Sequence, residues 1–133
     1  LKSIYCPKGD GSIIITGATD GIGLEYTYQF ISRGFGVVMI ARNEKKLKHR
    51  IKEIKEKHPQ ANVEYIQFDF DTYNYPDENG QTQYSKLFQK IDCLEAEIVG
   101  IVNNVGILTI QPYEFMPHEV IDRMIKVNCL PAA

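Results

Sequence analysis

The sequence has no tryptophan and only three cysteines, Cys6, Cys93 and Cys129, among its 133 residues. The cysteines are widely separated, with no CxxC pair and no histidine at ligand spacing, so neither a disulfide framework nor a zinc site is predicted. We expect free thiols in a reducing compartment and no bound metal. The absence of any Asn-x-Ser/Thr sequon also disfavours a secreted protein.

Long apolar runs are absent as well. No stretch reaches the ~18 apolar residues that a transmembrane helix requires, and no secretory signal opens the chain. The sequence begins at Leu1 and stops after Ala133 without a capping or tail signal, so we expect a fragment truncated at both ends. Any membrane association is then expected to come through segments outside this chain.

The charge of the chain is nearly balanced. Its formal net charge is −2, and 44% of its residues are hydrophobic, which describes an ordinary globular segment rather than disorder. One basic run from Arg42 to Lys57 has eight Lys or Arg residues against three Glu. This run is typical either of a nucleic-acid contact or of a solvated helix face with i,i+4 pairs such as Glu44–Lys48. Because no aromatic residues interleave the basic ones, we favour the solvated face and predict no nucleic-acid partner.

Strand-like and helix-like patterns alternate along the chain. Short runs, mostly of apolar and β-branched residues, predict strands over Ser12–Thr16, Gly36–Ile40, Val63–Phe68 and Ile98–Val102. Apolar residues at helical spacing predict helices over Gly21–Ser32, 43–58 and Tyr84–Leu94, and a last helix that Pro117 opens. This alternation predicts an α/β fold: a Rossmann-type, doubly wound parallel sheet, incomplete, with its first four strands in the order 3-2-1-4.

Three shorter segments support further structural predictions. The residues Leu87, Phe88 and Ile91 are expected to face the core from the third helix. The segment 71–83 is rich in Asp, Asn, Tyr, Pro and Gly and is expected to form an exposed loop. Pro131 is expected to kink or fray the last helix, since an interior proline costs about 3 kcal/mol.

A glycine-rich segment follows the first predicted strand directly. It reads Thr16-Gly-Ala-Thr-Asp-Gly-Ile-Gly23, and a helix comes after it. The glycines allow a sharp turn, a close approach of the backbone to a pyrophosphate and close packing of the helix on the strand. The helix N-terminus offers unpaired N–H groups and a partial positive charge to phosphates. We therefore predict that a dinucleotide is bound by Gly17, Thr19, Asp20, Gly21, Ile22 and Gly23.

The spacing Gly-x3-Gly-x-Gly after a threonine resembles the fingerprint of the short-chain dehydrogenase/reductase family. The end of the second strand then indicates which dinucleotide binds. NAD-specific members place an acid there for the ribose hydroxyls, whereas this chain has the small Ala41 followed by Arg42. A guanidinium pairs bidentately with a 2′-phosphate, so Arg42 favours NADP(H) over NAD(H). The alternative is that Arg42 is only the first basic residue of the next helix.

Two further motifs are similar to those of the same family. Asp69 follows the third strand, where the resemblance implies a hydrogen bond to the adenine amino group, and Asp71 is a competing candidate. The sequence Asn103-Asn-Val-Gly106 is similar to the family's Asn-Asn-Ala-Gly signature. The resemblance implies that the two asparagines brace the sheet and that Asn104 lies against the cofactor ribose, with Gly106 also in the cofactor site.

The catalytic residues of the family are only partly represented. Asn128 matches the helix asparagine of the catalytic tetrad, whose backbone carbonyl holds a water linked to the catalytic Lys. None of the eight tyrosines is followed by a Lys four residues later, so the catalytic Ser and the Tyr-x3-Lys pair are expected beyond residue 133. The chain as given is therefore expected to be inert.

The motifs at 16–23 and 102–106 are similar to those of a narrower branch, the 17β-hydroxysteroid dehydrogenases and very-long-chain 3-oxoacyl-CoA reductases. This resemblance implies an NADPH-dependent reductase of a lipid ketone, foremost a 3-oxoacyl-CoA of fatty-acid elongation. It also implies a homo-oligomer at the cytosolic face of the endoplasmic reticulum membrane, or otherwise a cytoplasmic protein. A hydroxysteroid or other alcohol dehydrogenase and a non-catalytic NADP(H)-binding member are the alternatives. Residues 1–133 would form the NADP-binding N-terminal half of one domain.

Overall fold

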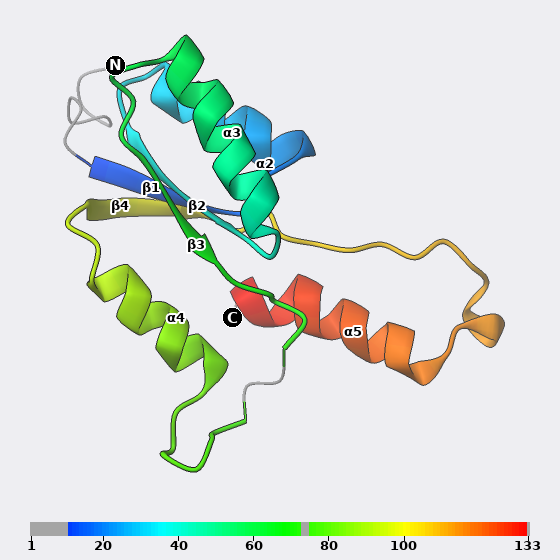
Figure 1. The fold of residues 1–133 in the computed structure, drawn as a ribbon. Coiled ribbons are helices and arrows are strands. Elements are labelled where there is room, and N and C mark those ends of the chain that lie inside the picture. The colour runs from blue at the N-terminus through cyan, green and yellow to red at the C-terminus, as the bar shows by residue number, and fades with distance from the viewer. Residues whose placement is uncertain (1–10, 73–74, 133) are drawn as a thin grey trace.

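The computed structural model describes residues 11–72 and 75–132 and contains a four-stranded parallel sheet (Figure 1). Its strands are β1 (Gly11–Thr16), β2 (Gly36–Ala41), β3 (Val63–Gln67) and β4 (Glu97–Val102). They are ordered β3-β2-β1-β4, and every neighbouring pair is parallel. The predicted α/β class and strand order are therefore confirmed. Of the three cysteines, Cys93 and Cys129 are free and exposed, while Cys6 lies outside the described residues.

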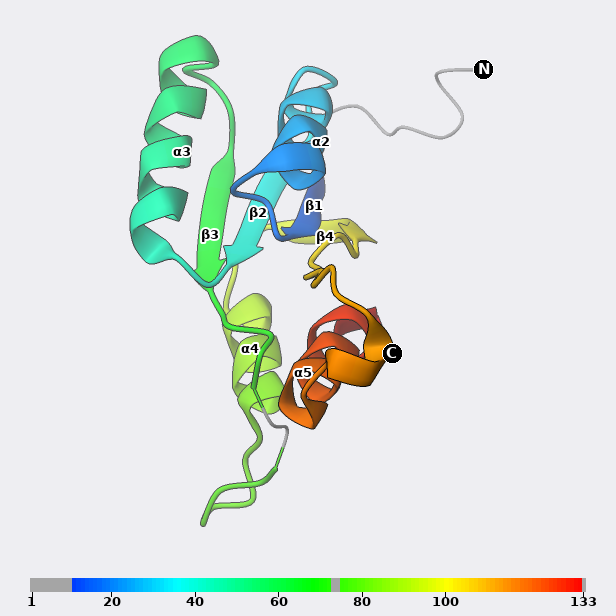
Figure 2. The same ribbon diagram turned by 90° about the vertical axis from the view of Figure 1, so that its right-hand side faces the viewer.

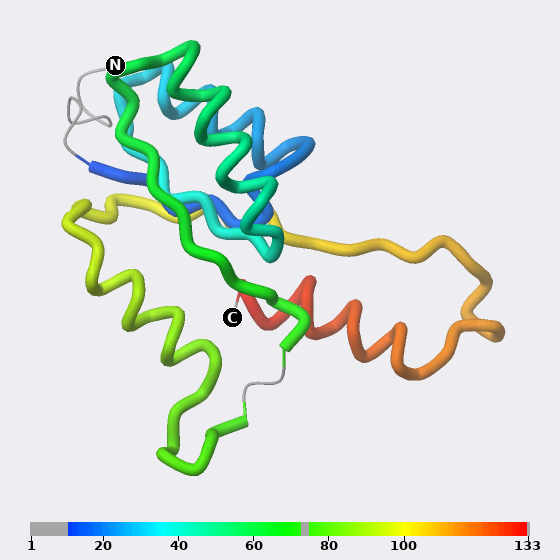
Figure 3. The backbone as a smooth tube through the Cα atoms, in the orientation of Figure 1, coloured from blue at the N-terminus to red at the C-terminus, as the bar shows by residue number. Residues whose placement is uncertain are grey.

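Helices cover both faces of the sheet. They are α2 (Gly21–Ile31), α3 (Glu44–Lys57), α4 (Gln83–Asp92) and α5 (His118–Cys129), with short 3-10 turns η1 (Tyr113–Phe115) and η2 (Leu130–Ala132). Figure 2 shows α2 and α3 on one side of the sheet and α4 and α5 on the other. The chain between β4 and α5 runs away from the sheet before α5 returns beneath it (Figure 3). None of the helices in the described ranges is long and apolar enough to cross a membrane.

Two apolar cores form because successive strand residues point to opposite faces. Ile13 and Ile15 of β1 belong to the core under α2 and α3, where Leu47 and Ile54 are fully buried. Ile14 belongs to the other core, together with Leu87 of α4 and Val127 of α5. Burying one such aliphatic side chain contributes roughly 1.5–3 kcal/mol. These two cores hold the helices in place and thereby fix the loops at the strand ends.

The predicted core position of Phe88 is wrong, because its side chain is 58% exposed. Helix α4 contacts its core through Leu87, with Tyr84 and Ile91 packed alongside. This i, i+3, i+7 stripe is narrow, and Phe88 lies on its flank, about 100° around the helix from Leu87.

The start of α4 and the end of α5 are each set by nearby residues. Helix α4 begins one residue earlier than predicted, because Thr82 and Ser85 form a reciprocal capping box. Helix α5 ends at Cys129 and continues as the 3-10 turn that contains Pro131. The α-helix thus stops short of Pro131, which agrees with the expectation that it kinks or frays there, since proline has no N–H to continue the helical ladder.

Within the predicted loop 71–83, residues 75–81 are exposed as predicted, whereas Asp71, Thr72 and Thr82 are half-buried. The tip of this loop is ordered by hydrogen bonds. The Asp77 carboxylate accepts from the backbone N–H groups of Asn79 and Gln81, at 2.9 and 3.0 Å. The ammonium of Lys86 on α4 also binds Asp77, at 2.7 Å. The hydrogen bond from Lys86, followed by those from the backbone, lowers the pKa of Asp77. A single aspartate thus closes the turn and ties it to the helix that follows.

Candidate functional site

The carboxyl ends of all four strands meet at one cleft of ≈ 350 Å³. Parallel strands bring their following loops to one edge of a sheet, which is where ligands bind in open α/β folds. Eight of the predicted site residues line this cleft: Gly17, Thr19, Asp20, Gly21, Arg42, Asp69, Asn104 and Gly106. Three others, Ile22, Gly23 and Asn128, are not among its lining residues. The side chain of Ile22 is 70% exposed on the first turn of α2.

The loop between β1 and α2 depends on glycine for two different reasons. Gly17 and Gly21 have φ angles of 65° and 53°, in the left-handed region that side chains with a Cβ rarely adopt. At Gly23 the requirement is space, because a Cβ there would lie 2.5 Å from both the Gly17 carbonyl oxygen and Asn104 Nδ2. The helix therefore packs directly on the loop, and no side chain fits between them.

The N-terminus of α2 has the features of an anion-binding site. Asp20 occupies the N-cap position, yet its side chain makes no capping hydrogen bond, and the first turn of α2 contains no acidic residue. The first N–H groups of a helix have no partner within the helix, and they carry a partial positive charge. A phosphate at this position would satisfy groups that Asp20 does not.

The end of β4 is fastened to the same loop through Asn104 and Thr16. The buried Thr16 hydroxyl accepts hydrogen bonds from the backbone N–H groups of Asn104 and Val105, at 2.9 and 3.0 Å. The Asn104 amide donates to the carbonyl oxygens of Thr16 and Gly17, at 3.0 and 3.3 Å. These four bonds fix the glycine loop against the strand next to it, which makes the cleft wall rigid.

Arg42 stands at the rim of the cleft immediately after β2. Its backbone carbonyl accepts from Gln67, but among the described residues its guanidinium has no hydrogen-bond or ion-pair partner. By contrast, the guanidinium groups of Arg33, Arg50 and Arg123 all bind protein acceptors. The preceding residue, Ala41, is buried and also lines the cleft. The site therefore presents an exposed cation beside a small residue.

The two candidate aspartates after β3 differ in whether other side chains of the protein already bind them. Asp71 is occupied by α5: its Oδ2 accepts from Arg123 Nε at 2.6 Å, and Lys126 lies 3.5 Å from its Oδ1. Asp69 is exposed in the cleft wall, and among the described residues it accepts one hydrogen bond, from the Asp71 N–H at 3.0 Å. Asp69 is thus the better placed of the two for a ligand.

Asn128 uses its side chain to hold the segment that follows β4. Its Oδ1 accepts from the Ile107 N–H at 2.8 Å, and its Nδ2 donates to the Ile107 carbonyl at 3.0 Å. A Cβ on Gly106 would lie 3.2 Å from the same Oδ1. In this chain, Asn128 therefore links α5 to the loop at the cleft.

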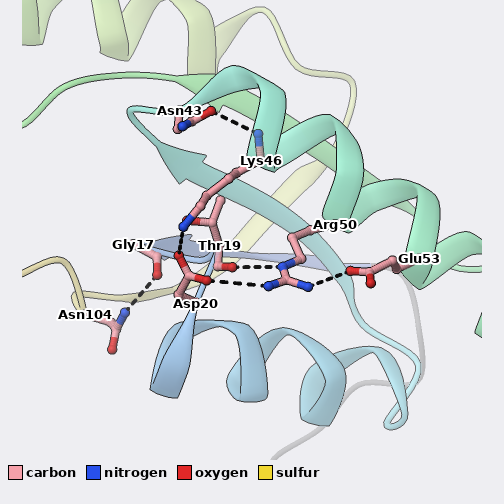
Figure 4. A network of polar contacts seen from close by, with 8 residues as sticks. All are labelled: Gly17, Thr19, Asp20, Asn43, Lys46, Arg50, Glu53 and Asn104. Carbon is pink, nitrogen blue, oxygen red and sulfur yellow. Dashed lines mark hydrogen bonds and ion pairs between the residues drawn. The ribbon is translucent and has the colours of Figure 1, made fainter.

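The sequence analysis did not predict that side chains of α3 bind the glycine loop between β1 and α2. Lys46 and Arg50 of α3 point toward Asp20 and Thr19, as Figure 4 shows. The interpretation of the basic run as a solvated face is therefore incomplete: Lys48 pairs with Glu44 as predicted, but Lys46 and Arg50 bind the glycine loop. Two basic residues at i,i+4 share one helix face, and that spacing was the available signal.

Comparisons with known proteins agree with this geometry. The family model described as short chain dehydrogenase matches residues 12–132. A Caenorhabditis elegans protein named "Putative steroid dehydrogenase 1" is 38% identical over 125 residues, which cover 90% of this chain and 37% of that protein. The very-long-chain 3-oxoacyl-CoA reductase of Pyricularia oryzae is 33% identical over 130 residues, covering 96% of this chain and 37% of the reductase.

A solved structure from Shigella flexneri 2a, described as a "putative short chain dehydrogenase" complexed with NADP, superposes with a TM-score of 0.78 at 26% identity. The superposition covers 92% of this chain and 48% of that structure. The chain thus spans 37% of the length of both curated relatives named above. With a family model matched from the first strand to the last helix, the chain belongs to the short-chain dehydrogenase family.

Proposed function

We propose that the full-length protein is an NADP(H)-dependent oxidoreductase that reduces the ketone of a lipid substrate, foremost a 3-oxoacyl-CoA. Residues 1–133 form the N-terminal, cofactor-binding half of its domain. The observation that carries the cofactor assignment is Arg42, whose guanidinium stands at the cleft rim without a partner among the described residues. An exposed cation next to Ala41, where an acid would repel a phosphate, suits a 2′-phosphorylated dinucleotide.

The remaining cleft residues fit the same ligand. The backbone at Gly17 and Gly21 and the uncapped N-terminus of α2 would hold the diphosphate. Asp69 would accept from the adenine amino group, and Asn104 and Gly106 would lie along the ribose. When bound, the nicotinamide supplies the hydride, and the chain's own residues hold and orient it. Thr19 and Asp20 belong to the loop beside this site, and Ile22 lies on the first turn of α2. Gly23 lets α2 pack directly on the loop.

The substrate class is supported by the relatives. One of those named above is a very-long-chain 3-oxoacyl-CoA reductase, and another carries a steroid dehydrogenase name. We also propose that the protein acts at the cytosolic face of the endoplasmic reticulum membrane as a homo-oligomer, because the branch that the motifs at 16–23 and 102–106 resemble implies both. Asn128 would serve the downstream catalytic residues through its backbone carbonyl, because its side chain is already bound to Ile107.

The cofactor assignment is tested by titrating NADPH and NADH against the full-length protein and its Arg42→Asp variant. We expect NADPH to bind at least tenfold more tightly to the parent, since a charge-assisted bidentate contact contributes about 1.5–3 kcal/mol. Arg42→Asp is expected to abolish this preference. Arg33→Asp carries the same charge change on an arginine that binds Gln29 instead, and it should leave the preference intact. Equal affinities of the parent for the two dinucleotides would contradict the assignment.

The substrate is tested by following NADPH oxidation with 3-oxoacyl-CoA thioesters of increasing chain length and with steroid ketones. Rates that rise with acyl length support the lipid reductase. Turnover of steroid ketones alone would favour the hydroxysteroid dehydrogenase, which the name of the nematode relative favours. NADPH binding without turnover of any ketone would identify a non-catalytic family member.

A further inference from the structure

An acidic residue sits in the loop that is proposed to bind phosphates. Asp20 lines the cleft, and its side chain is 56% exposed. A carboxylate there offsets the partial positive charge at the N-terminus of α2 and would repel any anionic ligand in the same cleft. Asp20 makes no capping hydrogen bond, so its carboxylate leaves the first N–H groups of α2 available to a ligand.

The carboxylate is instead compensated from α3. Asp20 Oδ2 accepts from Lys46 Nζ at 2.8 Å, and Asp20 Oδ1 lies 3.5 Å from Arg50 Nη2 (Figure 4). The hydrogen bond from Lys46 is the largest influence that lowers the pKa of Asp20, so the residue is ionised at neutral pH. Lys46 reaches it across 26 positions of sequence, which makes the pair a tertiary contact between two consecutive βα units.

Arg50 has other partners and is the weaker of the two compensating cations. Its Nη1 binds Glu53 Oε2 at 2.7 Å, and its Nε donates to the Thr19 carbonyl at 3.1 Å. Arg50 therefore holds the backbone of the loop, while its charge is largely balanced by Glu53. The neutralisation of Asp20 depends mainly on Lys46.

We propose that Lys46 is a positioning residue for cofactor binding: it cancels the Asp20 charge, so that the cleft accepts the more highly charged of the two dinucleotides. This inference rests on the proposed NADP(H) function. Without Lys46, the carboxylate of Asp20 would face a ligand whose 2′-phosphate adds further negative charge near Arg42. A unit charge acting over 5–10 Å at a protein surface changes an affinity by roughly three- to tenfold, and salt weakens the effect.

The experiment measures the Kd of NADPH and NADH for the full-length protein at low ionic strength, with four variants. Lys46→Met is expected to weaken NADPH binding about three- to tenfold and NADH binding less. Asp20→Asn alone should tighten NADPH binding, because Lys46 then faces the ligand uncompensated. The double variant Asp20→Asn/Lys46→Met should return the NADPH Kd to within about twofold of the parent. Lys52→Met removes the same charge from an exposed site of α3 and should change neither Kd.

Three results would overturn the inference. Lys46→Met with parental affinity would show that Asp20 needs no compensation. A double variant as weak as Lys46→Met would show that Lys46 contacts the ligand directly. Equal weakening for both dinucleotides would show that the pair supports only the loop. A parent protein that binds neither dinucleotide would instead contradict the proposed function itself, so the two failures are distinguishable.

Discussion

Substitution of Gly23 by alanine tests whether the cleft depends on direct packing of α2 on the glycine loop. The new Cβ would lie 2.5 Å from the Gly17 carbonyl oxygen and from Asn104 Nδ2, and the carbonyl belongs to backbone that cannot move freely. Overpacking of this kind costs about 1–3 kcal/mol. Displacing the Asn104 amide would also lose two hydrogen bonds worth about 1 kcal/mol each. Alanine regains roughly 1 kcal/mol in helix propensity.

The net expectation is a loss of about 2–4 kcal/mol for Gly23→Ala, which lowers the Tm of the full-length protein by about 4–16 °C. Circular dichroism melts with and without NADPH measure this, and the stabilisation by NADPH should also disappear. Gly34→Ala is the control: its φ of 88° makes alanine strained, but its Cβ meets open space away from the cleft. It should lower the Tm while NADPH still raises it. An unchanged Tm and an intact NADPH effect for Gly23→Ala would refute the close-packing argument.

Three further predictions concern the rest of the chain. Thr16→Val removes the acceptor of two backbone N–H groups and should cost about 2–4 kcal/mol, whereas Thr16→Ser keeps most of the stability; thermal melts of the full-length protein compare them. The pKa of Asp77 is lowered from 3.8, so the turn it closes is fully stabilised above that pH and is lost as the pH falls through the lower folded-state value. An NMR titration should place its midpoint below 3.8, and Lys86→Met should raise it; a parental midpoint at or above 3.8 would be inconsistent with the turn. Residues 1–133 expressed alone should be poorly soluble or only partly folded, because Val99 and Ile101 on the edge strand β4 are 44% and 57% exposed. A sharp cooperative melt with monomeric elution would contradict this.

The elements and their order were predictable because their signals are local. Mostly apolar runs of five or six residues identified all four strands, and the glycines that follow β1 marked the turn into α2. The parallel order followed from the alternation of strands and helices, which leaves few topologies. Errors arose where a signal was weak or shared: Phe88 fits a helical apolar pattern, yet it lies beside the contact stripe of α4.

The sequence by itself determined which chemistry meets at the cleft, because the glycine loop, Arg42, Asp69 and Asn104 each begin within two residues of a strand end. Only the tertiary structure decided which charges stay available for a ligand. Asp71 is bound by Arg123 across 52 positions, and Asp20 is bound by Lys46 across 26, whereas Arg42 is left without a partner among the described residues. The physical reason is that an ion pair depends on the distance between two side chains in space, and the packing of helices on the sheet sets that distance.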